Sequence, residues 1–134
     1  MRKICLLLLW VSVLHGCSSN DNNDNSPGAV TFGSWRVSTF LERGSDETGD
    51  FAGYIFTFSA NGQALAVKGG VSKAGSWSMT GSSRFNVDFG AKSDANKPLG
   101  ELTDDWKIIS VSGSQIKLTD DNPSSAEFLT FTKN

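Results

Sequence analysis

The strongest constraint on the fold is an apolar residue at every second position, a pattern that recurs in short runs from Phe32 onward. A period of two is typical of a β-strand with one buried face, whereas an amphipathic helix has a period of 3.6. Asn61-Gly62 is a hairpin-turn signal between two such runs, and Gly69-Gly70 interrupts another. The runs predict eight strands, over residues 35–41, 53–59, 63–68, 75–80, 84–89, 106–111, 115–119 and 127–132.

Eight short strands with mostly tight connections predict an all-β fold, an antiparallel up-and-down eight-stranded barrel, because closure removes the open edges of a sheet. One connection is long, from residue 90 to residue 105. Within it, Pro98 can begin one short helical turn before the sixth strand. Leu99 and Leu102 would then share one face and could plug one end of the barrel.

The first 16 residues have the order of a removable leader: basic Arg2 and Lys3, then an apolar run from Ile4 to Leu14. The run is too short to span a bilayer, which needs about 20 residues. The following segment, Leu14-His15-Gly16-Cys17, resembles a bacterial lipobox. This resemblance implies cleavage before Cys17 and acylation of that residue, with palmitate-like chains that hold a protein firmly at a membrane. The alternative is an ordinary signal peptide followed by an accidental cysteine.

These patterns divide the chain into residues 1–16, a lipoprotein signal peptide; 17–31, the lipidated Cys17 and a flexible tether; and 32–134, the barrel domain. Ser18 after the cysteine resembles outer-membrane sorting. We therefore expect a bacterial outer-membrane protein, lipid-anchored, that faces the periplasm or the cell surface. The acidic, Asn-rich stretch over residues 18–25 resembles surface-export signals of some Gram-negative lineages, and a simple solvated tether explains it equally well.

The charge of the chain argues against anionic partners, and its cysteine content argues against stabilisation by disulfides. Removal of Arg2 and Lys3 with the leader leaves 10 basic residues against 14 acidic ones. A mildly acidic domain has no electrostatic support for binding nucleic acid or an anionic membrane surface. Because Cys5 is lost with the leader, the mature monomer cannot form a disulfide. We expect a monomer that depends on its apolar core.

No catalytic residues, metal site or cofactor are predicted. The only histidine, His15, lies in the leader, which removes Ser-His-Asp, Cys-His and His-zinc chemistry. Acidic pairs such as Asp104-Asp105 fall in predicted loops, where solvated charge is the usual role. The segment over residues 45–50 offers oxygens to Ca²⁺ but lacks the spacing of a known calcium loop. The sequence therefore favours a protein that is not an enzyme.

Gly33-Ser34-Trp35, which opens the first strand, is similar to the Gly-x-Trp signature of the lipocalin and fatty-acid-binding superfamily. With the second Gly-Ser-Trp at 75–77 and the late Asp105-Trp106, residues 32–133 resemble the small lipocalin-like domains of Gram-negative envelope lipoproteins. The resemblance implies a non-catalytic barrel that takes a small hydrophobic ligand. Lipocalins also place an Arg against the first Trp, and the C-terminal candidate here is Lys133.

Alternation assigns a mostly large apolar set to the barrel interior. Its members are Trp35, Val37, Phe56, Phe58, Leu65, Val67, Trp77, Phe85, Val87, Phe89, Trp106, Ile108, Ile116, Leu118, Leu129 and Phe131. Eight strands enclose room for side chains or for one small ligand, so a packed core and a small pocket are both open. A pocket would be lined by the bulkiest of these residues, Phe56, Phe58, Trp77, Phe89 and Trp106. None of them is charged, so a bound fatty acid would keep its head at the barrel mouth, near Lys73 or Arg43.

Three apolar residues fall on the outward face of neighbouring strands: Phe40, Ile55 and Phe128. If the last strand pairs with the first, these three would lie together as a partner-docking patch. Scattered surface apolar residues are the ordinary alternative. The patch supports a second hypothesis for the function: a structural or interaction module with a filled barrel that docks an envelope partner.

Overall fold

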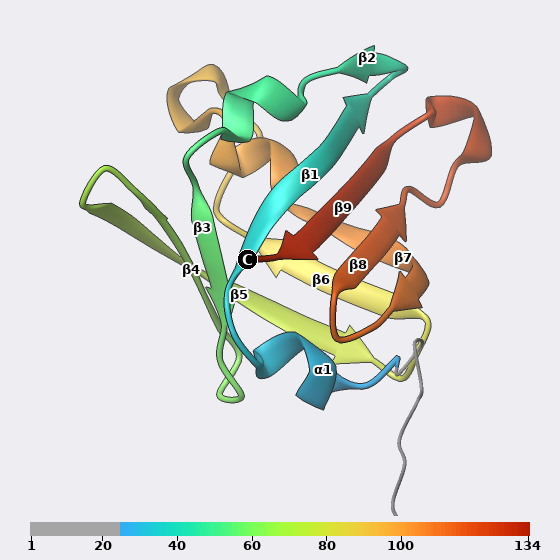
Figure 1. The fold of residues 1–134 in the computed structure, drawn as a ribbon. Coiled ribbons are helices and arrows are strands. Elements are labelled where there is room, and N and C mark those ends of the chain that lie inside the picture. The colour runs from blue at the N-terminus through green and yellow to red at the C-terminus, as the bar shows by residue number, and fades with distance from the viewer. Residues whose placement is uncertain (1–24) are drawn as a thin grey trace, which may run out of the picture.

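Eight antiparallel strands close into a barrel in the computed structural model, which describes residues 25–134 (Figure 1). The all-β, up-and-down prediction is confirmed, because the strands neighbour one another in chain order. The barrel strands are β1 (Trp35–Glu42), β3 (Ile55–Phe58), β4 (Gln63–Lys68), β5 (Val71–Thr80), β6 (Arg84–Asp88), β7 (Asp104–Val111), β8 (Gln115–Thr119) and β9 (Phe128–Lys133). A two-residue strand, β2 (Ser45–Asp46), pairs only with the end of β1.

The two seams that flank β1 differ in how they are held. On one side, β9 pairs with β1 along its length, from Trp35 opposite Lys133 to Leu41 opposite Phe128. On the other side, β1 and β3 share a single registered pair, Trp35 with Phe56. The 3₁₀ turn η1 (Thr48–Phe51) lies beside β1, and the rings of Phe51 and Phe40 meet edge to face at 5.2 Å. Aromatic packing therefore supplements the sparse backbone pairing of this seam.

Short helical segments lie at the two ends of the barrel (Figure 1). The helix α1 (Pro27–Thr31) lies at one end, which we call the α1 end. β2, η1, η2 (Asp94–Asn96) and η3 (Leu99–Leu102) lie at the opposite end, which we call the loop end; η4 (Pro123–Ser125) precedes β9. The turn η3 confirms the predicted helical turn, and Leu99 and Leu102 are both buried. Among residues 25–134, no helix is long and apolar enough to cross a membrane.

The predicted tether extends too far toward the domain. Pro27–Thr31 form a helix whose Val30 is fully buried, and the indole Nε1 of Trp35 donates to the Val30 carbonyl oxygen at 3.0 Å. The Val111 amide donates to the side-chain oxygen of Asn25 at 2.6 Å. Residues 25–31 therefore belong to the folded domain, which begins before residue 32. The predicted signal peptide and Cys17 lie outside the described residues and stay predictions.

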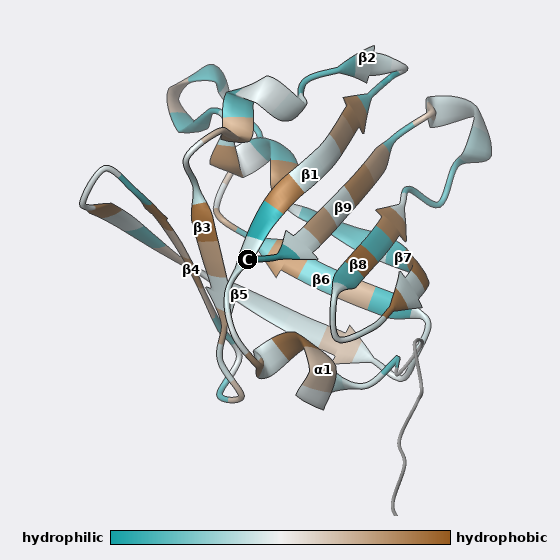
Figure 2. Cartoon of the chain, viewed as in Figure 1, coloured by the Kyte–Doolittle hydropathy of each residue, from teal (hydrophilic) through white to brown (hydrophobic). Residues whose placement is uncertain are grey.

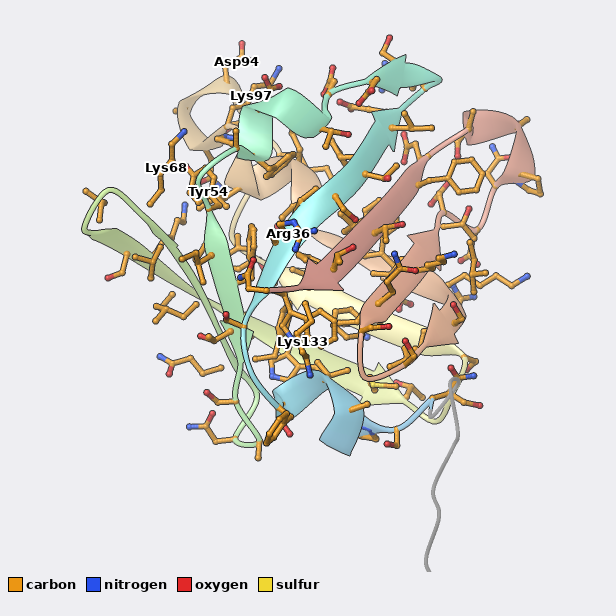
Figure 3. All side chains as sticks on the ribbon, viewed as in Figure 1. Arg36, Tyr54, Lys68, Asp94, Lys97 and Lys133 are labelled. Atoms are coloured by element: carbon orange, nitrogen blue, oxygen red, sulfur yellow. The ribbon has the colours of Figure 1, made fainter. Side chains whose placement is uncertain are left out.

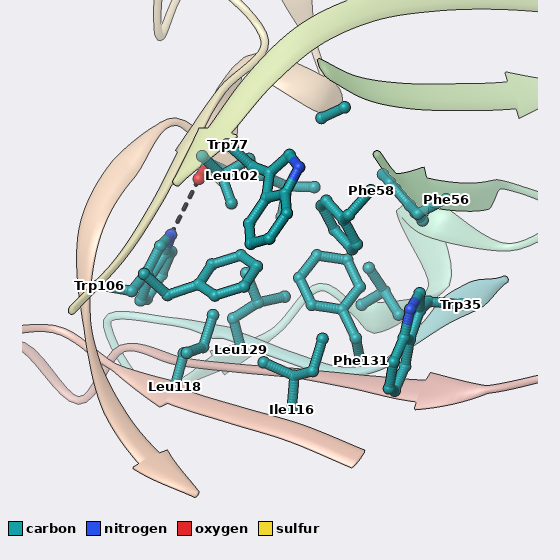
Figure 4. Packing of buried hydrophobic residues seen from close by; sticks show 14 of the residues in the cluster. Trp35, Phe56, Phe58, Trp77, Leu102, Trp106, Ile116, Leu118, Leu129 and Phe131 are labelled. Atoms are coloured by element: carbon teal, nitrogen blue, oxygen red, sulfur yellow. Dashed lines mark hydrogen bonds between the residues drawn. The ribbon is translucent and has the colours of Figure 1, made fainter. Parts of the chain in front are cut away.

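The barrel interior is filled by apolar side chains (Figure 4). Among the described residues, 22 hydrophobic side chains are buried and no polar or charged one is. The ring of Phe58 lies edge to face with Trp77, Phe85 and Phe131, at centroid distances of 5.7, 5.6 and 5.4 Å. All of the predicted inward residues are buried except Leu65 and Val67. The packed-core alternative therefore describes this interior.

The inward face of β4 was predicted one residue out of register. Ala64 and Ala66 are buried, while Leu65 and Val67 are half-buried. In the register of the sheet, Ala64 lies opposite Phe58 and Ala66 lies opposite Phe56. Opposed residues of an antiparallel pair share one face, so the two phenylalanine rings leave room only for small side chains beside them.

Irregularities in two strands also redirect side chains. The pairing of β1 with β9 shifts register between Val37 and Thr39, and Phe40 consequently points inward, with 2% of its surface exposed. A second shift, between Ile108 and Ser110 of β7, turns Val111 inward, where it is buried. A bulge adds one residue to a strand and so inverts the alternation beyond it.

Candidate functional site

The five side chains predicted to line an interior pocket are all buried. They contact other side chains of the core or a backbone carbonyl group (Figure 4). The rings of Phe56 and Phe89 meet at 6.0 Å, and those of Phe58 and Trp77 meet at 5.7 Å. The indole Nε1 of Trp106 donates to the Leu102 carbonyl oxygen at 2.9 Å. These residues form part of the packed core, and their role in ligand binding stays a prediction.

The three residues predicted as a docking patch do not lie together. Phe40 is buried against Phe51. Ile55 and Phe128 are 49% and 39% exposed, but Phe128 pairs with Leu41 at the end of β1, whereas Ile55 lies beside the residue that pairs with the start of β1. The prediction of one patch is therefore wrong, and its physical reason is the bulge that turns Phe40 inward.

A cavity of about 290 Å³ lies at the loop end, between the β4–β5 hairpin and the turns η2 and η3. Its apolar side chains include Tyr54, Ala66, Val71 and Leu99, and its cations are Lys68, Lys73 and Lys97. Figure 3 shows Tyr54, Lys68 and Lys97 gathered at this end of the molecule. Ala95 and Asn96 complete the lining. We call this site the lysine pocket.

Two of the three lysines in the lysine pocket have no acidic partner. Lys68 Nζ lies 5.1 Å from the centre of the Tyr54 ring, and Lys73 Nζ donates to the side-chain oxygen of Asn96. Within the described part of the chain, neither ammonium group lies within 4.0 Å of a carboxylate oxygen. Lys97, by contrast, lies 3.3 Å from Glu101 and 3.5 Å from Asp94, and hydrogen bonds to these two carboxylates raise the pKa of Lys97. The pocket therefore presents net positive charge.

The loop that carries η2 and η3 is held by hydrogen bonds within itself and by contacts between η3 and β6. The side-chain amide of Asn96 donates to the carbonyl oxygens of Phe89 and Ala91, at 3.0 and 2.9 Å. A Cβ atom on Gly100 would lie 2.2 Å from the Ala91 carbonyl oxygen, so only glycine fits there. These contacts fix the position of the Asn96 side-chain oxygen, which accepts a hydrogen bond from Lys73. The lysine pocket is therefore held in shape by the fold around it.

Two further cavities are, like the lysine pocket, open to solvent. One, of about 450 Å³, is lined by Glu42, Arg43, Lys92, Ser93, Asp94, Lys97 and Glu101. The other, of about 540 Å³, is lined by Ser76, Trp77, Ser78, Asn86, Val87, Asp88, Thr103, Asp104 and Asp105. The sequence predicts Lys73 or Arg43 as the cation beside the head group of a ligand. These two residues line different cavities: Lys73 lines the lysine pocket, and Arg43 lines the cavity of about 450 Å³.

A cluster of three carboxylates lies at the loop end: Glu42, Glu47 and Glu101. One oxygen from each lies within 4.8 Å of the others. A hydrogen bond with Glu42, burial and the neighbouring negative charges raise the pKa of Glu47. The sequence indicated oxygens in the segment 45–50 but not the contact with Glu101, because these residues are distant in the chain and only the barrel brings them together.

Lys133, near the α1 end, is a cation that lies against aromatic rings (Figure 3). Its Nζ lies 4.7 Å from the centre of the Trp35 ring and 5.1 Å from that of Phe32, and burial lowers the pKa of Lys133. Lys133 thus lies against the first tryptophan, where the lipocalin resemblance implies an arginine. None of the three cavities above includes Lys133.

The chain is similar in fold to three solved bacterial proteins. One is a lipocalin-like protein from Bacteroides uniformis ATCC 8492, with a TM-score of 0.57 and 18% identity over 80% of this chain and 100% of that one. A DUF4847 family protein from Bacteroides vulgatus ATCC 8482 gives a TM-score of 0.58 and 15% identity over 78% of this chain and 94% of that one. A protein from Burkholderia xenovorans, solved by NMR, gives a TM-score of 0.51 and 16% identity over 89% of this chain and 94% of that one.

A scan against protein-family models found no match, and a search of curated proteins found none. At these low identities, the structural similarity speaks to the fold and not to the ligand or activity. The fold that the Gly-x-Trp signature implies is nevertheless confirmed: the chain folds as a lipocalin-like, eight-stranded antiparallel barrel.

Proposed function

We propose that this protein is a lipid-anchored, non-catalytic binding protein of the bacterial outer membrane that takes a small anionic amphiphile in the lysine pocket. The observation that carries the proposal is that two lysines without a carboxylate partner, Lys68 and Lys73, lie in one pocket. The same pocket has an apolar lining that includes Tyr54, Ala66 and Leu99. Ammonium groups form strong, charge-assisted hydrogen bonds with carboxylates. The apolar lining suits a short hydrocarbon segment.

The volume of the lysine pocket narrows the class of ligand. About 290 Å³ is close to the lower limit for small-molecule sites. A slim molecule, such as a fatty acid of medium chain length, fits this volume better than a ring system. The packed interior favours a ligand at the loop end over one threaded through the barrel.

Isothermal titration calorimetry with decanoate tests this proposal, with decanol as the uncharged comparison. We expect saturable binding of decanoate and weaker binding of decanol, because only decanoate can pair with the lysines. Replacing both cations, with Lys68→Gln and Lys73→Gln together, should weaken decanoate binding by about tenfold or more.

Lys117→Gln is the matched control, since Lys117 is an exposed cation on β8, outside the pocket. It removes one positive charge and should leave decanoate affinity unchanged. The proposal fails if decanoate does not bind saturably, or if the pocket double variant binds it as tightly as wild type does.

The anchoring part of the proposal rests on the Leu14-His15-Gly16-Cys17 sequence. Cys17→Ser removes the only thiol that the leader pattern offers for acylation. We expect membrane fractionation to find wild type with the outer membrane and the variant in the soluble fraction. A variant that stays with the outer membrane as wild type does would contradict the lipid anchor.

The filled interior favours a second candidate function, that of an interaction module that docks an envelope partner. The surface patch predicted for such docking is not present, because Phe40 is buried. Failure of the decanoate titration, with a folded protein, would leave this candidate in front.

A further inference from the structure

Two carboxylate oxygens at the loop end are buried without a hydrogen-bond partner: Oε2 of Glu47 and Oε2 of Glu101. The Glu101 side chain is only 10% exposed, and its other oxygen, Oε1, lies 3.3 Å from Lys97. A buried carboxylate oxygen that has lost water and gained no donor destabilises the fold. A pair of such oxygens in one place calls for a ligand that supplies positive charge.

Both residues point into the same cluster. One carboxylate oxygen each from Glu42, Glu47 and Glu101 lies within 4.8 Å of the other two. The three residues come from separate elements, the end of β1, the position before η1, and η3. Lys97 is the one cation in contact with these three carboxylates among residues 25–134, so the cluster keeps an excess of negative charge.

We propose that Glu42, Glu47 and Glu101 form a binding site for a divalent metal ion of the calcium type. The donors are all oxygens, which hard cations prefer. Two oxygens bound to one Ca²⁺ at about 2.3–2.6 Å can be up to about 5 Å apart, which accommodates the 4.8 Å limit of this cluster. Mg²⁺ binds at about 2.0–2.1 Å and demands near-ideal octahedral geometry, so flexible side chains from three separate elements suit it less well.

The surroundings allow the remaining ligands of such an ion to be water. Glu42 and Glu101 also line the open cavity of about 450 Å³ at the loop end. A Ca²⁺ ion takes about six to eight oxygen ligands in flexible geometry, so three carboxylates and several waters complete its shell. The bound ion would tie β1, η1 and η3 together, beside the seam where β1 and β3 share only one registered pair.

The second acidic cluster, Asp104, Asp120 and Glu127, provides a contrast within the same chain. Its oxygens also lie within 4.8 Å of one another. Asp104 already pairs with Lys92 at 2.9 Å, and no buried, unpartnered carboxylate oxygen occurs in this cluster. We expect it not to bind the ion, which makes Glu127→Gln a matched control for the removal of one half-buried carboxylate.

The test is calorimetric titration of the full-length chain, in detergent micelles, with CaCl₂ alone. We expect one Ca²⁺ per chain and a higher melting temperature in its presence, because a ligand that binds only the folded state stabilises it. Glu101→Gln should weaken Ca²⁺ binding by about tenfold or more, since it removes a charged ligand. Glu127→Gln should bind Ca²⁺ as wild type does.

A second variant, Glu42→Gln, keeps the test valid if Glu101→Gln fails to fold, because Glu42 lies at the end of a strand, beside exposed Arg43. Circular dichroism confirms that each variant is folded. The proposal is overturned if wild type gives no saturable heat and no shift of melting temperature with CaCl₂. It is also overturned if Glu127→Gln, and not the loop-end variants, loses Ca²⁺ binding.

Discussion

The two ends of the barrel are built from different chemistry. At the α1 end, Val30 and Trp35 are fully buried, and a backbone carbonyl satisfies the indole N–H. At the loop end, charged side chains line cavities, and carboxylate oxygens are buried without partners. In Figure 2, α1 is pale to brown, without teal, whereas the loops at the opposite end combine teal, white and brown.

This difference separates stability from recognition. A sealed, apolar end contributes to folding but offers little to a polar or charged ligand. An end with unpaired charges is less favourable for folding, and such groups cluster where proteins bind ligands. We therefore place binding at the loop end and expect substitutions at the two ends to have separable effects.

The largest effect should come from the α1 end. Trp35→Ala removes a fully buried indole and its hydrogen bond to Val30, and it should lower the free energy of unfolding by about 3–5 kcal/mol. Denaturant melts of the two proteins measure this change. A loss below about 1 kcal/mol would mean that the α1 end does not seal the barrel.

At the loop end, the largest change in stability should come from Gly100→Ala. The added Cβ would lie 2.2 Å from the Ala91 carbonyl oxygen and 2.7 Å from the Asn96 side chain. Overpacking of this kind costs about 1–3 kcal/mol, and here it should also displace Asn96 and so weaken decanoate binding. Gly113→Ala is the control, because a Cβ there meets nothing within 4 Å. Equal effects of the two substitutions would show that the η2–η3 loop is not tightly packed.

Lys133 tests whether the cation at the α1 end is structural. Lys133→Ala removes the ammonium group over Trp35 and the stem that packs against Gly33, so it should cost about 1–2 kcal/mol. Lys133→Arg should retain wild-type stability, since a guanidinium also stacks on an indole. Decanoate affinity should be unchanged in both variants, and a loss of affinity would contradict the separation of the two ends.

The smallest effect on stability should come from the lysine pocket itself. Lys73→Gln keeps a polar side chain at a half-buried position and should change the free energy of unfolding by less than about 0.5 kcal/mol. The same substitution should measurably weaken decanoate binding. A thermal melt and a titration on the same sample compare the two effects. A large loss of stability with unchanged binding would reverse the roles assigned to this residue.

Alternation of apolar residues is enough to predict the barrel and most of its core, because a two-residue period depends only on local backbone geometry. It fails at Phe40 and Val111, where bulges invert the alternation. It fails again at β4, where small Ala64 and Ala66 point inward because the neighbouring phenylalanines already fill the space. Such competition for volume is decided between strands and cannot be seen within one of them.

The candidate sites are harder to predict from the sequence than the fold is. Lys73, which the sequence predicts beside a ligand head group, lines the lysine pocket from β5, and that role stays a prediction. The sequence does not indicate its neighbours Lys68 and Lys97, since the hairpin and the η2–η3 loop meet only in the folded chain. The cluster of Glu42, Glu47 and Glu101 combines residues from the first and the later half of the chain. No spacing within a single segment indicates such a cluster.

Binding at the loop end is tested most directly by an NMR titration of the ¹⁵N-labelled protein with decanoate. The titration follows backbone amides and indole N–H groups together. We predict saturable shifts at Tyr54, Lys73 and Asn96 in the lysine pocket, with the indole resonances of Trp35 and Trp106 unmoved. Shifts concentrated on those two indoles, with the pocket amides unchanged, would place the ligand inside the barrel and contradict binding at the loop end.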